Sequence, residues 1–147
     1  MKRYVVAAAM AALGGAASAD GHASTQGDPA AGEQQFNRQC VACHVVRDNA
    51  GEVLAGRNAR TGPNLFALAG RQIGALEEYR YSDGLIELGG TGATWTEEAF
   101  VNYVQDPTGW LRQTLDNRRA RGKMAYQVRQ ADQAYDIYAY LAGFSAE

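Results

Sequence analysis

One short motif constrains what this chain can fold around: Cys40, Cys43 and His44 form the pattern C-x-x-C-H. Two thiols at this spacing can add to the two vinyl groups of one porphyrin. The histidine that follows the second cysteine is then held under the ring, where its imidazole can bind iron. The motif therefore predicts a covalently attached c-type haem, with His44 as an iron ligand.

Three other uses of two neighbouring cysteines fit the sequence less well. A thioredoxin-like redox pair would lie beside a βαβ pattern, and the sequence has no parallel-sheet pattern. A zinc site needs about four ligands, whereas the whole chain holds 2 Cys and 2 His. A structural disulfide between residues so close in sequence would close a very small loop. We therefore interpret the rest of the chain as the cage and the docking surface of the haem.

The N-terminus has the features of a secretory signal peptide. Lys2 and Arg3 precede an apolar stretch of small residues, and Ala17-Ser18-Ala19 forms a small-x-small cleavage site. The apolar stretch is shorter than the roughly 20 residues that a membrane span needs, which argues against an uncleaved anchor. We expect residues 1–19 to be removed and residues 20–147 to form one domain, with no later membrane span.

Charge is unevenly distributed along the chain. Loss of Lys2 and Arg3 would leave 12 of the 14 basic residues against 16 acidic ones, so the mature net charge would be near −4. This balance argues against a general nucleic-acid-binding protein. Seven acids and one base lie between residues 77 and 106, whereas six bases and one acid lie between residues 111 and 129. The two charges are therefore concentrated in different segments.

Helix signals predict three main helices. Asp28-Pro29 supplies an N-cap and a first-turn proline for a helix of about ten residues that leads to Cys40. The sequence Thr94-Trp95-Thr96-Glu97 matches a capping box, which would open a second helix that ends at Asp106-Pro107, before a basic loop. Residues 132–143 carry an apolar face at helical spacing and predict the third.

Long, mostly polar connections join these helices. A small hairpin is indicated at Val45-Val46 and Val53-Leu54, on either side of a turn-like sequence at residues 48–51. Residues 79–84 indicate another turn, which a short apolar segment follows. A domain with so much loop would have a poor core unless a haem filled its centre. The expected fold class is all-α, with three main helices, short helices and long loops wrapped around one covalent haem.

Haem iron has a second axial position, for which Met124 is the main candidate. Met1 and Met10 belong to the signal peptide, so Met124 would be the only methionine of the mature chain. Its cationic, glycine-containing loop is a poor place for a methionine that only packs a core. His22, Lys123 and an open coordination position are the alternatives. A soft, neutral thioether would raise the potential, and with both axial positions filled the iron would transfer electrons and leave no position for O₂.

Taken in order, these residues resemble a class I cytochrome c, in particular the bacterial cytochrome c2 group. The matching landmarks are Gly32, Phe36, Cys40, Cys43, His44, Thr61-Gly62-Pro63-Asn64-Leu65, Gly70-Arg71, Tyr81, Thr94-Trp95, Tyr103, Pro107, Lys123-Met124 and Tyr140. The connections from His44 to Thr61 and from Pro107 to Met124 are longer than in the compact mitochondrial members. Gly122 stands where many members have threonine.

The resemblance implies roles for individual residues. The Pro63 carbonyl would accept a hydrogen bond from the His44 ring, and Tyr103 would donate to the Met124 sulfur or line its pocket. Three side chains would contact the haem propionates, because a buried carboxylate needs donors or a positive charge: Arg71, Tyr81 and Trp95. The first helix would pack across the last through Gly32, Phe36 and Tyr140.

The implied function is that of a soluble periplasmic electron carrier, monomeric and not an enzyme. In this family, bacterial haem attachment takes place outside the cytoplasm, which agrees with the signal peptide. The carrier would accept an electron from a quinol-oxidising membrane cytochrome complex and pass it to an oxidase, a photosynthetic reaction centre or a reductase. A haem enzyme or a gas-binding module is the alternative if Met124 is not an iron ligand. The expected docking face consists of Arg118, Arg119, Arg121 and Lys123.

Overall fold

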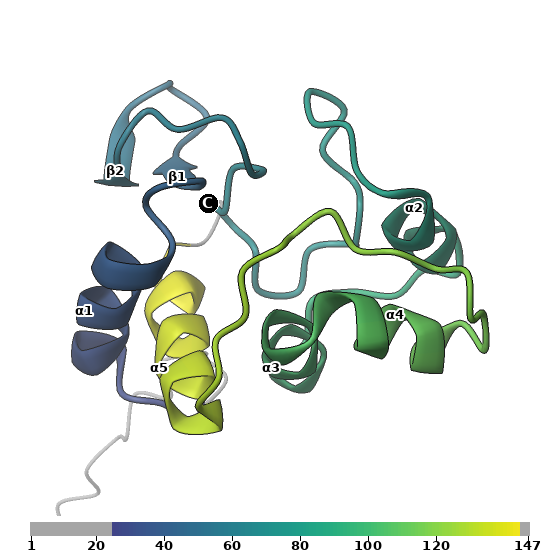
Figure 1. Ribbon diagram of the computed structural model, residues 1–147. Coiled ribbons are helices and arrows are strands. Elements are labelled where there is room, and N and C mark those ends of the chain that lie inside the picture. Colours follow the sequence, from purple (N-terminus) through teal and green to yellow (C-terminus); the bar gives the residue numbers. More distant parts are fainter. Residues whose placement is uncertain (1–24, 145–147) are drawn as a thin grey trace, which may run out of the picture.

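Figure 1 presents the computed structural model, in which residues 25–144 are described. The predicted signal peptide and the alternative ligand His22 lie outside these residues. The chain is mostly helical, and its elements follow the order α1 (Pro29–Gln39), β1 (Val45–Arg47), β2 (Val53–Gly56), α2 (Asp83–Gly90), α3 (Glu97–Gln105), α4 (Pro107–Thr114) and α5 (Ala131–Ala142). Within residues 25–144, every helix is too short or too polar to cross a bilayer.

Helices α1 and α5 lie side by side (Figure 1) and cross closely at a glycine. The Asp28 carboxylate caps α1 by accepting a hydrogen bond from the Ala30 amide at 2.8 Å. One turn further on, a Cβ atom at Gly32 would lie 1.9 Å from the Asp136 carbonyl oxygen of α5, so no side chain fits there. The Phe36 and Tyr140 rings pack at a centroid distance of 5.6 Å. The predicted crossing is therefore confirmed.

The predicted hairpin is also confirmed. Strands β1 and β2 pair in antiparallel register, with Val45 opposite Gly56. The turn between them closes through a hydrogen bond of 3.1 Å from the Gly51 amide to the Asp48 carbonyl oxygen, and Gly51 takes the positive φ of 89° that this turn requires. Val46 is fully buried and fixes the hairpin to the core, directly after the C-x-x-C-H motif.

The predicted capping box was wrong, because α3 is capped two residues later. Thr96, and not Thr94, is the N-cap, and its hydroxyl accepts a hydrogen bond from the Ala99 amide at 3.1 Å. Thr94 instead pairs with Gln72 in an isolated β-bridge that joins two loops. From the local sequence alone, Thr94 would be the N-cap. A tertiary contact places it in a β-bridge instead.

The predicted basic loop after Asp106-Pro107 was also wrong over its first part, which is the helix α4. The Asp106 carboxylate accepts a hydrogen bond from the Gly109 amide at 2.9 Å, and Pro107 occupies the first turn. The same dipeptide therefore ends α3 and begins α4, since proline is excluded from helix interiors but favoured in a first turn. The basic loop begins only after Thr114.

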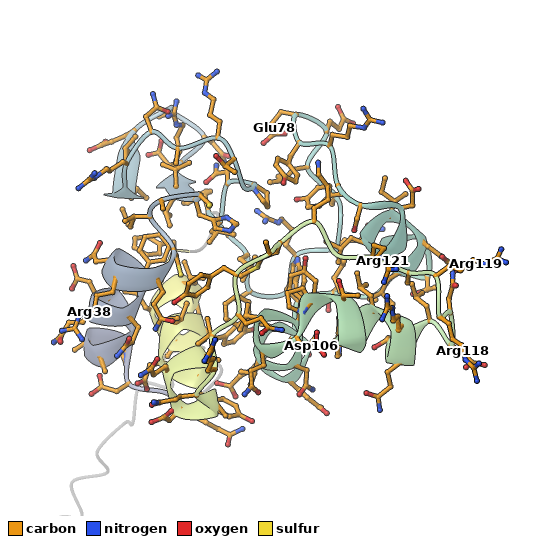
Figure 2. The ribbon with its side chains drawn as sticks, viewed as in Figure 1. Arg38, Glu78, Asp106, Arg118, Arg119 and Arg121 are labelled. Carbon is orange, nitrogen blue, oxygen red and sulfur yellow. The ribbon has the colours of Figure 1, made fainter. Side chains whose placement is uncertain are left out.

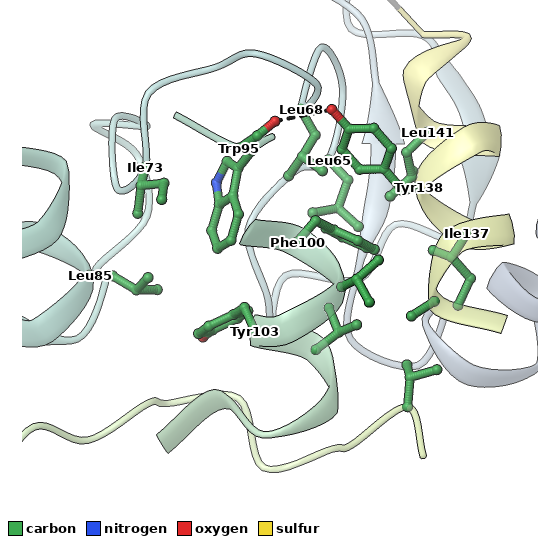
Figure 3. Packing of buried hydrophobic residues seen from close by; sticks show 14 of the residues in the cluster. Leu65, Leu68, Ile73, Leu85, Trp95, Phe100, Tyr103, Ile137, Tyr138 and Leu141 are labelled. Atoms are coloured by element: carbon green, nitrogen blue, oxygen red, sulfur yellow. Dashed lines mark hydrogen bonds between the residues drawn. The ribbon is translucent and has the colours of Figure 1, made fainter. Parts of the chain in front are cut away.

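The core joins the helices to the long loops (Figure 3). Phe100 of α3 packs on Tyr138 of α5 at a centroid distance of 5.5 Å. The Tyr138 hydroxyl donates a hydrogen bond of 3.1 Å to the Trp95 carbonyl oxygen, in the loop before α3. Leu65 and Leu68, in the loop between β2 and α2, are buried in the same core. The loops are thus held rigidly enough to form the walls of a pocket.

Candidate haem site

A cavity of about 460 Å³ brings together chain segments that lie some eighty residues apart in sequence. Six of the predicted site residues line it: Cys43, His44, Pro63, Tyr81, Tyr103 and Met124. The other walls are Thr61, Gly62, Tyr79, Ser82, Leu85, Lys123, Ala125 and Tyr126. The predicted residues Cys40, Arg71 and Trp95 are not among the lining residues. Two residues of the C-x-x-C-H motif, Cys43 and His44, thus line the same cavity as Met124.

The C-x-x-C-H motif forms a tight turn at the end of α1. Cys40 is the C-cap of α1, and its carbonyl oxygen accepts hydrogen bonds from the amides of Cys43 at 3.1 Å and His44 at 2.9 Å. This turn carries Cys43 and His44 directly from the helix end into the cavity wall. The helix thereby provides a rigid base for both cysteines and for the histidine.

His44 has the geometry of an oriented, neutral imidazole. Its Nδ1 atom lies 2.9 Å from the Pro63 carbonyl oxygen, which accepts a hydrogen bond from an Nδ1 proton. The Nε2 atom then keeps the lone pair that can bind a metal ion. Burial lowers the pKa of His44, although the Pro63 hydrogen bond acts in the opposite direction. The imidazole therefore stays neutral near pH 7, the form required of a ligand.

Gly62 provides the space for this imidazole. A Cβ atom at position 62 would lie 2.3 Å from the His44 Cε1 atom. The Gly62 amide also donates a hydrogen bond of 2.7 Å to the Cys43 carbonyl oxygen, which ties this loop to the motif. In the sequence, Gly62 stands out only as one of the landmarks of the family resemblance. Its role depends on the close approach of two segments, which no local pattern reveals.

The Cys40 thiol does not have the character of a redox-active thiol. Burial, assisted by the nearby Cys43, raises the pKa of Cys40 to about 12. A dithiol that reacts by exchange needs a thiolate of lowered pKa. Among residues 25–144, no group of three or more His, Cys, Asp and Glu side chains is arranged to hold a metal ion. The raised pKa of Cys40 argues against the thioredoxin interpretation.

Met124, in the loop before α5, and Tyr103, on α3, line the same cavity. Met124 is half-buried against the core, and Tyr103 is buried on α3. The Tyr103 ring packs edge-on against Trp95 at 5.2 Å between centroids. Burial raises the pKa of Tyr103, so its hydroxyl remains a proton donor at physiological pH. Lys123, the alternative ligand, donates from its Nζ atom to the Arg80 carbonyl oxygen, so its ammonium is already engaged.

Arg71 supplies a test of whether an anionic group fits this site. Its guanidinium donates from Nη1 to the Phe66 carbonyl oxygen at 2.6 Å and from Nη2 to the Asn64 carbonyl oxygen at 3.1 Å. The buried Nε atom has no partner among the described residues. Burial lowers the pKa of Arg71, the penalty of a cation that is withdrawn from water. A carboxylate such as a haem propionate would satisfy both the charge and the free N–H, so the residues fit the group.

Tyr81 lies near Arg71. It is buried and lines the cavity, and burial raises its pKa while the nearby charge of Arg71 acts in the opposite direction. A protonated phenol and a guanidinium are therefore placed close to each other. Trp95 is buried next to Tyr103 and contributes to the core at this point.

The helix order, the hairpin and the pocket define a class I c-type cytochrome, and comparisons with known proteins agree. Cytochrome c2 of Rhodovulum adriaticum is 58% identical over 116 residues, which cover 79% of this chain and 91% of that protein. Cytochrome c2 of Cereibacter sphaeroides is 45% identical over 117 residues, 79% of this chain and 94% of that protein. No protein-family model matches the sequence.

Solved structures show the same likeness. The crystal structure of cytochrome c2 from Rhodobacter sphaeroides superposes with a TM-score of 0.79 at 42% identity, over 83% of this chain and 99% of that one. Cytochrome c-550 from Paracoccus versutus gives a TM-score of 0.75 at 34% identity, over 82% and 100%. The chain belongs to the bacterial cytochrome c2 family. It is thus a cytochrome electron carrier, and its family implies a haem c cofactor.

Proposed function

We propose that this chain is a soluble, periplasmic, mono-haem electron carrier. It accepts one electron at a time from a quinol-oxidising membrane cytochrome complex and passes it to an oxidase, a reaction centre or a reductase. The observation that carries the proposal is that His44 and Met124, from distant segments, line one cavity. When bound, haem c supplies a one-electron Fe(III)/Fe(II) couple.

The protein would hold one haem and fill both axial coordination positions of its iron with side chains. Cys40 and Cys43 would carry the thioether attachments, and His44 and Met124 would bind the iron. The Pro63 carbonyl, 2.9 Å from His44 Nδ1, fixes the plane of the imidazole. Because both ligands are protein side chains, O₂ and peroxide are excluded from the iron. This exclusion favours electron transfer over a haem enzyme or a gas-binding module.

Arg71 and Tyr81, with Trp95 near them, would hold the propionates of the haem. The Nε atom of Arg71, which has no hydrogen-bond partner within residues 25–144, supports this assignment. A buried positive charge near the haem stabilises the propionates as carboxylates. Tyr103 keeps its proton because burial raises its pKa, and it can therefore donate to the Met124 sulfur.

The docking face lies beside the methionine loop. Arg119, Arg121 and Lys123 line a surface cavity of about 640 Å³ with Arg80, and Lys123 also lines the haem cavity. Figure 2 shows Arg118 and Arg119 at the end of the molecule opposite Arg38, with Arg121 nearer the centre. Asp83 and Glu87 also border this cavity, so it carries both signs of charge with cations in excess. Such a surface steers an acidic partner and releases it readily.

The absorption spectrum of the purified ferric protein tests this proposal. A sulfur-to-iron band near the red edge of the spectrum is expected, and it should disappear in Met124→Ala. The variant should also have a much lower midpoint potential, because axial ligands are among the factors that tune haem potentials over about 0.8 V, and it should bind cyanide quickly. An unchanged spectrum and potential would remove Met124 as a ligand and would return the haem enzyme and the gas-binding module to consideration.

A further inference from the structure

The methionine loop, residues 115–130 between α4 and α5, is fixed by backbone amides on both sides of Met124. The Gly122 amide, just before the methionine, donates a hydrogen bond of 3.1 Å to the Thr108 hydroxyl of α4. The Val128 amide, after the methionine, donates one of 2.9 Å to the Val104 carbonyl oxygen of α3. Between these points, the backbone of residues 123–127 makes no hydrogen bond within residues 25–144. The path of the Met124 backbone therefore depends on the two flanking amides.

Both acceptors come from the junction at which α3 ends and α4 begins. The last carbonyl groups of a helix lack helical donors, and Pro107 has no N–H to supply one. Val104 lies in the last turn of α3, and its carbonyl oxygen accepts the Val128 amide instead. Thr108 lies in the first turn of α4, directly after the proline. The interruption between the two helices thus provides one acceptor on each side, and the methionine loop uses both.

The loop lies close against this junction. A Cβ atom at Gly122 would lie 3.0 Å from the Pro107 Cβ atom and 3.3 Å from the Pro107 carbonyl oxygen. The glycine backbone is therefore in direct contact with a buried proline. One turn further along α4, Arg112 donates from Nε to the carbonyl oxygen of the buried Ala120 at 3.2 Å. Helix α4 thus holds residues 120–122, the segment that leads into the methionine.

Two side chains of residues 123–127 also make hydrogen bonds, but they restrain the backbone less. Lys123 donates from Nζ to the Arg80 carbonyl oxygen, and the Tyr126 hydroxyl donates to the Gln39 Oε1 atom at 3.0 Å. Both groups stand at the ends of long, exposed side chains. Thr108 differs because its β-branched side chain is stiff at χ1 and its hydroxyl binds a backbone amide directly. Few free torsions separate this hydroxyl from the helix that carries it.

We propose, on the basis of the proposed function, that Thr108 is a positioning residue for the proposed iron ligand Met124. Its hydroxyl fixes Gly122 and thereby keeps the methionine beside the cavity that His44 also lines. Without this bond, residues 121–127 are held only at Ala120 and Val128, and they open more often as a local unit. Thr108 acts through the loop, and its effect is on the fraction of time for which the methionine leaves its place.

Cyanide binding to the haem-loaded ferric protein tests this role. Thr108→Val removes the hydroxyl and keeps the β-branched shape, whereas Thr108→Ser keeps the hydroxyl. The matched control, Thr114→Val, makes the same change at an exposed threonine at the end of α4. We expect Thr108→Val to bind cyanide about fivefold faster, because the closed loop loses one hydrogen bond. Thr108→Ser and Thr114→Val should bind it at the wild-type rate.

Two further measurements separate an effect on the loop from a loss of the ligand. Exchange of the Gly122 amide with solvent, followed by NMR, should accelerate in Thr108→Val by a similar factor. The sulfur-to-iron band of Thr108→Val should persist at neutral pH, because the closed loop still predominates. Both readouts are independent of electron transfer to a partner.

A wild-type rate of cyanide binding in Thr108→Val would overturn the positioning role, even if the Gly122 amide exchanged faster, because the bond would then be structural only. An equal acceleration in Thr114→Val, or an accelerated rate in Thr108→Ser, would also overturn it, because the hydroxyl at position 108 would not be the cause. Failure of the proposed function would instead appear in the wild-type protein. That protein would lack the sulfur-to-iron band and would bind cyanide as fast as Met124→Ala.

Discussion

The ammonium group of Lys123 lies 5.1 Å from the centroid of the Tyr79 ring and donates a hydrogen bond to the adjacent Arg80 carbonyl oxygen. The Tyr79 hydroxyl, in turn, donates a hydrogen bond of 3.1 Å to the Thr61 carbonyl oxygen. Thr61, Tyr79 and Lys123 all line the haem cavity. The residue before the methionine is thus tied, through Tyr79, to the loop that orients His44.

This link predicts that Lys123→Ala loosens the methionine loop. Loss of an exposed cation–π contact and one hydrogen bond should lower the free energy of unfolding by about 1 kcal/mol. The loop should also open more often, so cyanide should bind to the ferric protein faster. Denaturant unfolding and cyanide-binding kinetics measure the two effects. Arg121→Ala, a cation in the same loop, is the control, and equal effects in both variants would argue against a specific role of the Tyr79 contact.

The α1–α5 crossing predicts a severe effect of one methyl group. Gly32→Ala would place a Cβ atom 1.9 Å from the Asp136 carbonyl oxygen, so the helices must move apart. We expect a loss of at least about 2 kcal/mol in unfolding free energy, in the range of overpacked cores. Gly90→Ala, in α2, has no atom within 4 Å of the added methyl group and should be neutral or stabilising. Thermal or denaturant unfolding compares them, and equal stabilities would mean that the crossing can adjust freely.

The parts of the fold that could be predicted are those that short sequences determine by themselves. Asp28-Pro29 determines the start of α1 through a local cap, and the apolar spacing of residues 132–143 corresponds to α5, Ala131–Ala142. The C-x-x-C-H motif predicts haem attachment without help from the rest of the chain. In each case the decisive groups lie within a few residues of one another.

The parts that could not be predicted depend on contacts between distant segments. Thr94 could have capped a helix, but it pairs with Gln72 in a β-bridge instead. The Lys123–Tyr79 contact joins two loops 44 positions apart, and no periodicity marks either residue. Within the described residues, the buried Nε atom of Arg71 has no hydrogen-bond partner. This feature also depends on how the surrounding loop folds, so the sequence alone does not reveal it.

The buried tyrosine of the haem cavity predicts a loss of stability in alkali. Burial raises the pKa of Tyr103, so above pH 10, the usual tyrosine pKa, the unfolded chain loses this proton while the folded chain keeps it. The unfolded state then binds fewer protons, and the free energy of unfolding falls by up to about 1.4 kcal/mol per pH unit. Below pH 10 this contribution to stability is fully present. It disappears as pH rises toward the raised pKa.

Tyr103→Phe removes this proton and should flatten the fall. Unfolding by denaturant at several pH values between 9 and about 11.5, near and above the usual tyrosine pKa of about 10, measures the slope. Tyr126→Phe, which changes an exposed tyrosine, should leave the slope as in the wild type. If Tyr103→Phe retains the wild-type slope, other buried groups control the alkaline transition.

The cationic surface beside the methionine loop predicts that electron transfer depends on salt. The segment from Arg112 to Arg129 holds six bases, and Arg119 and Arg121 line a cavity that adjoins the haem cavity through Lys123. Charges at the surface are screened over about 8 Å at physiological salt. Transfer from an acidic partner should therefore slow as salt rises, because steering raises encounter rates by roughly 10 to 10³-fold. Stopped-flow measurement of second-order rates against ionic strength gives this dependence.

Reversal of three charges on that surface tests its role. Arg118→Glu/Arg119→Glu/Arg121→Glu should slow transfer at low salt and flatten or invert the salt dependence, with the midpoint potential nearly unchanged. The control makes the same change in net charge at three exposed arginines outside the loop: Arg38, Arg57 and Arg60. A docking role for the loop requires a larger effect from the first triple variant than from the control. A wild-type rate at low salt in the first variant would mean that the partner binds another face.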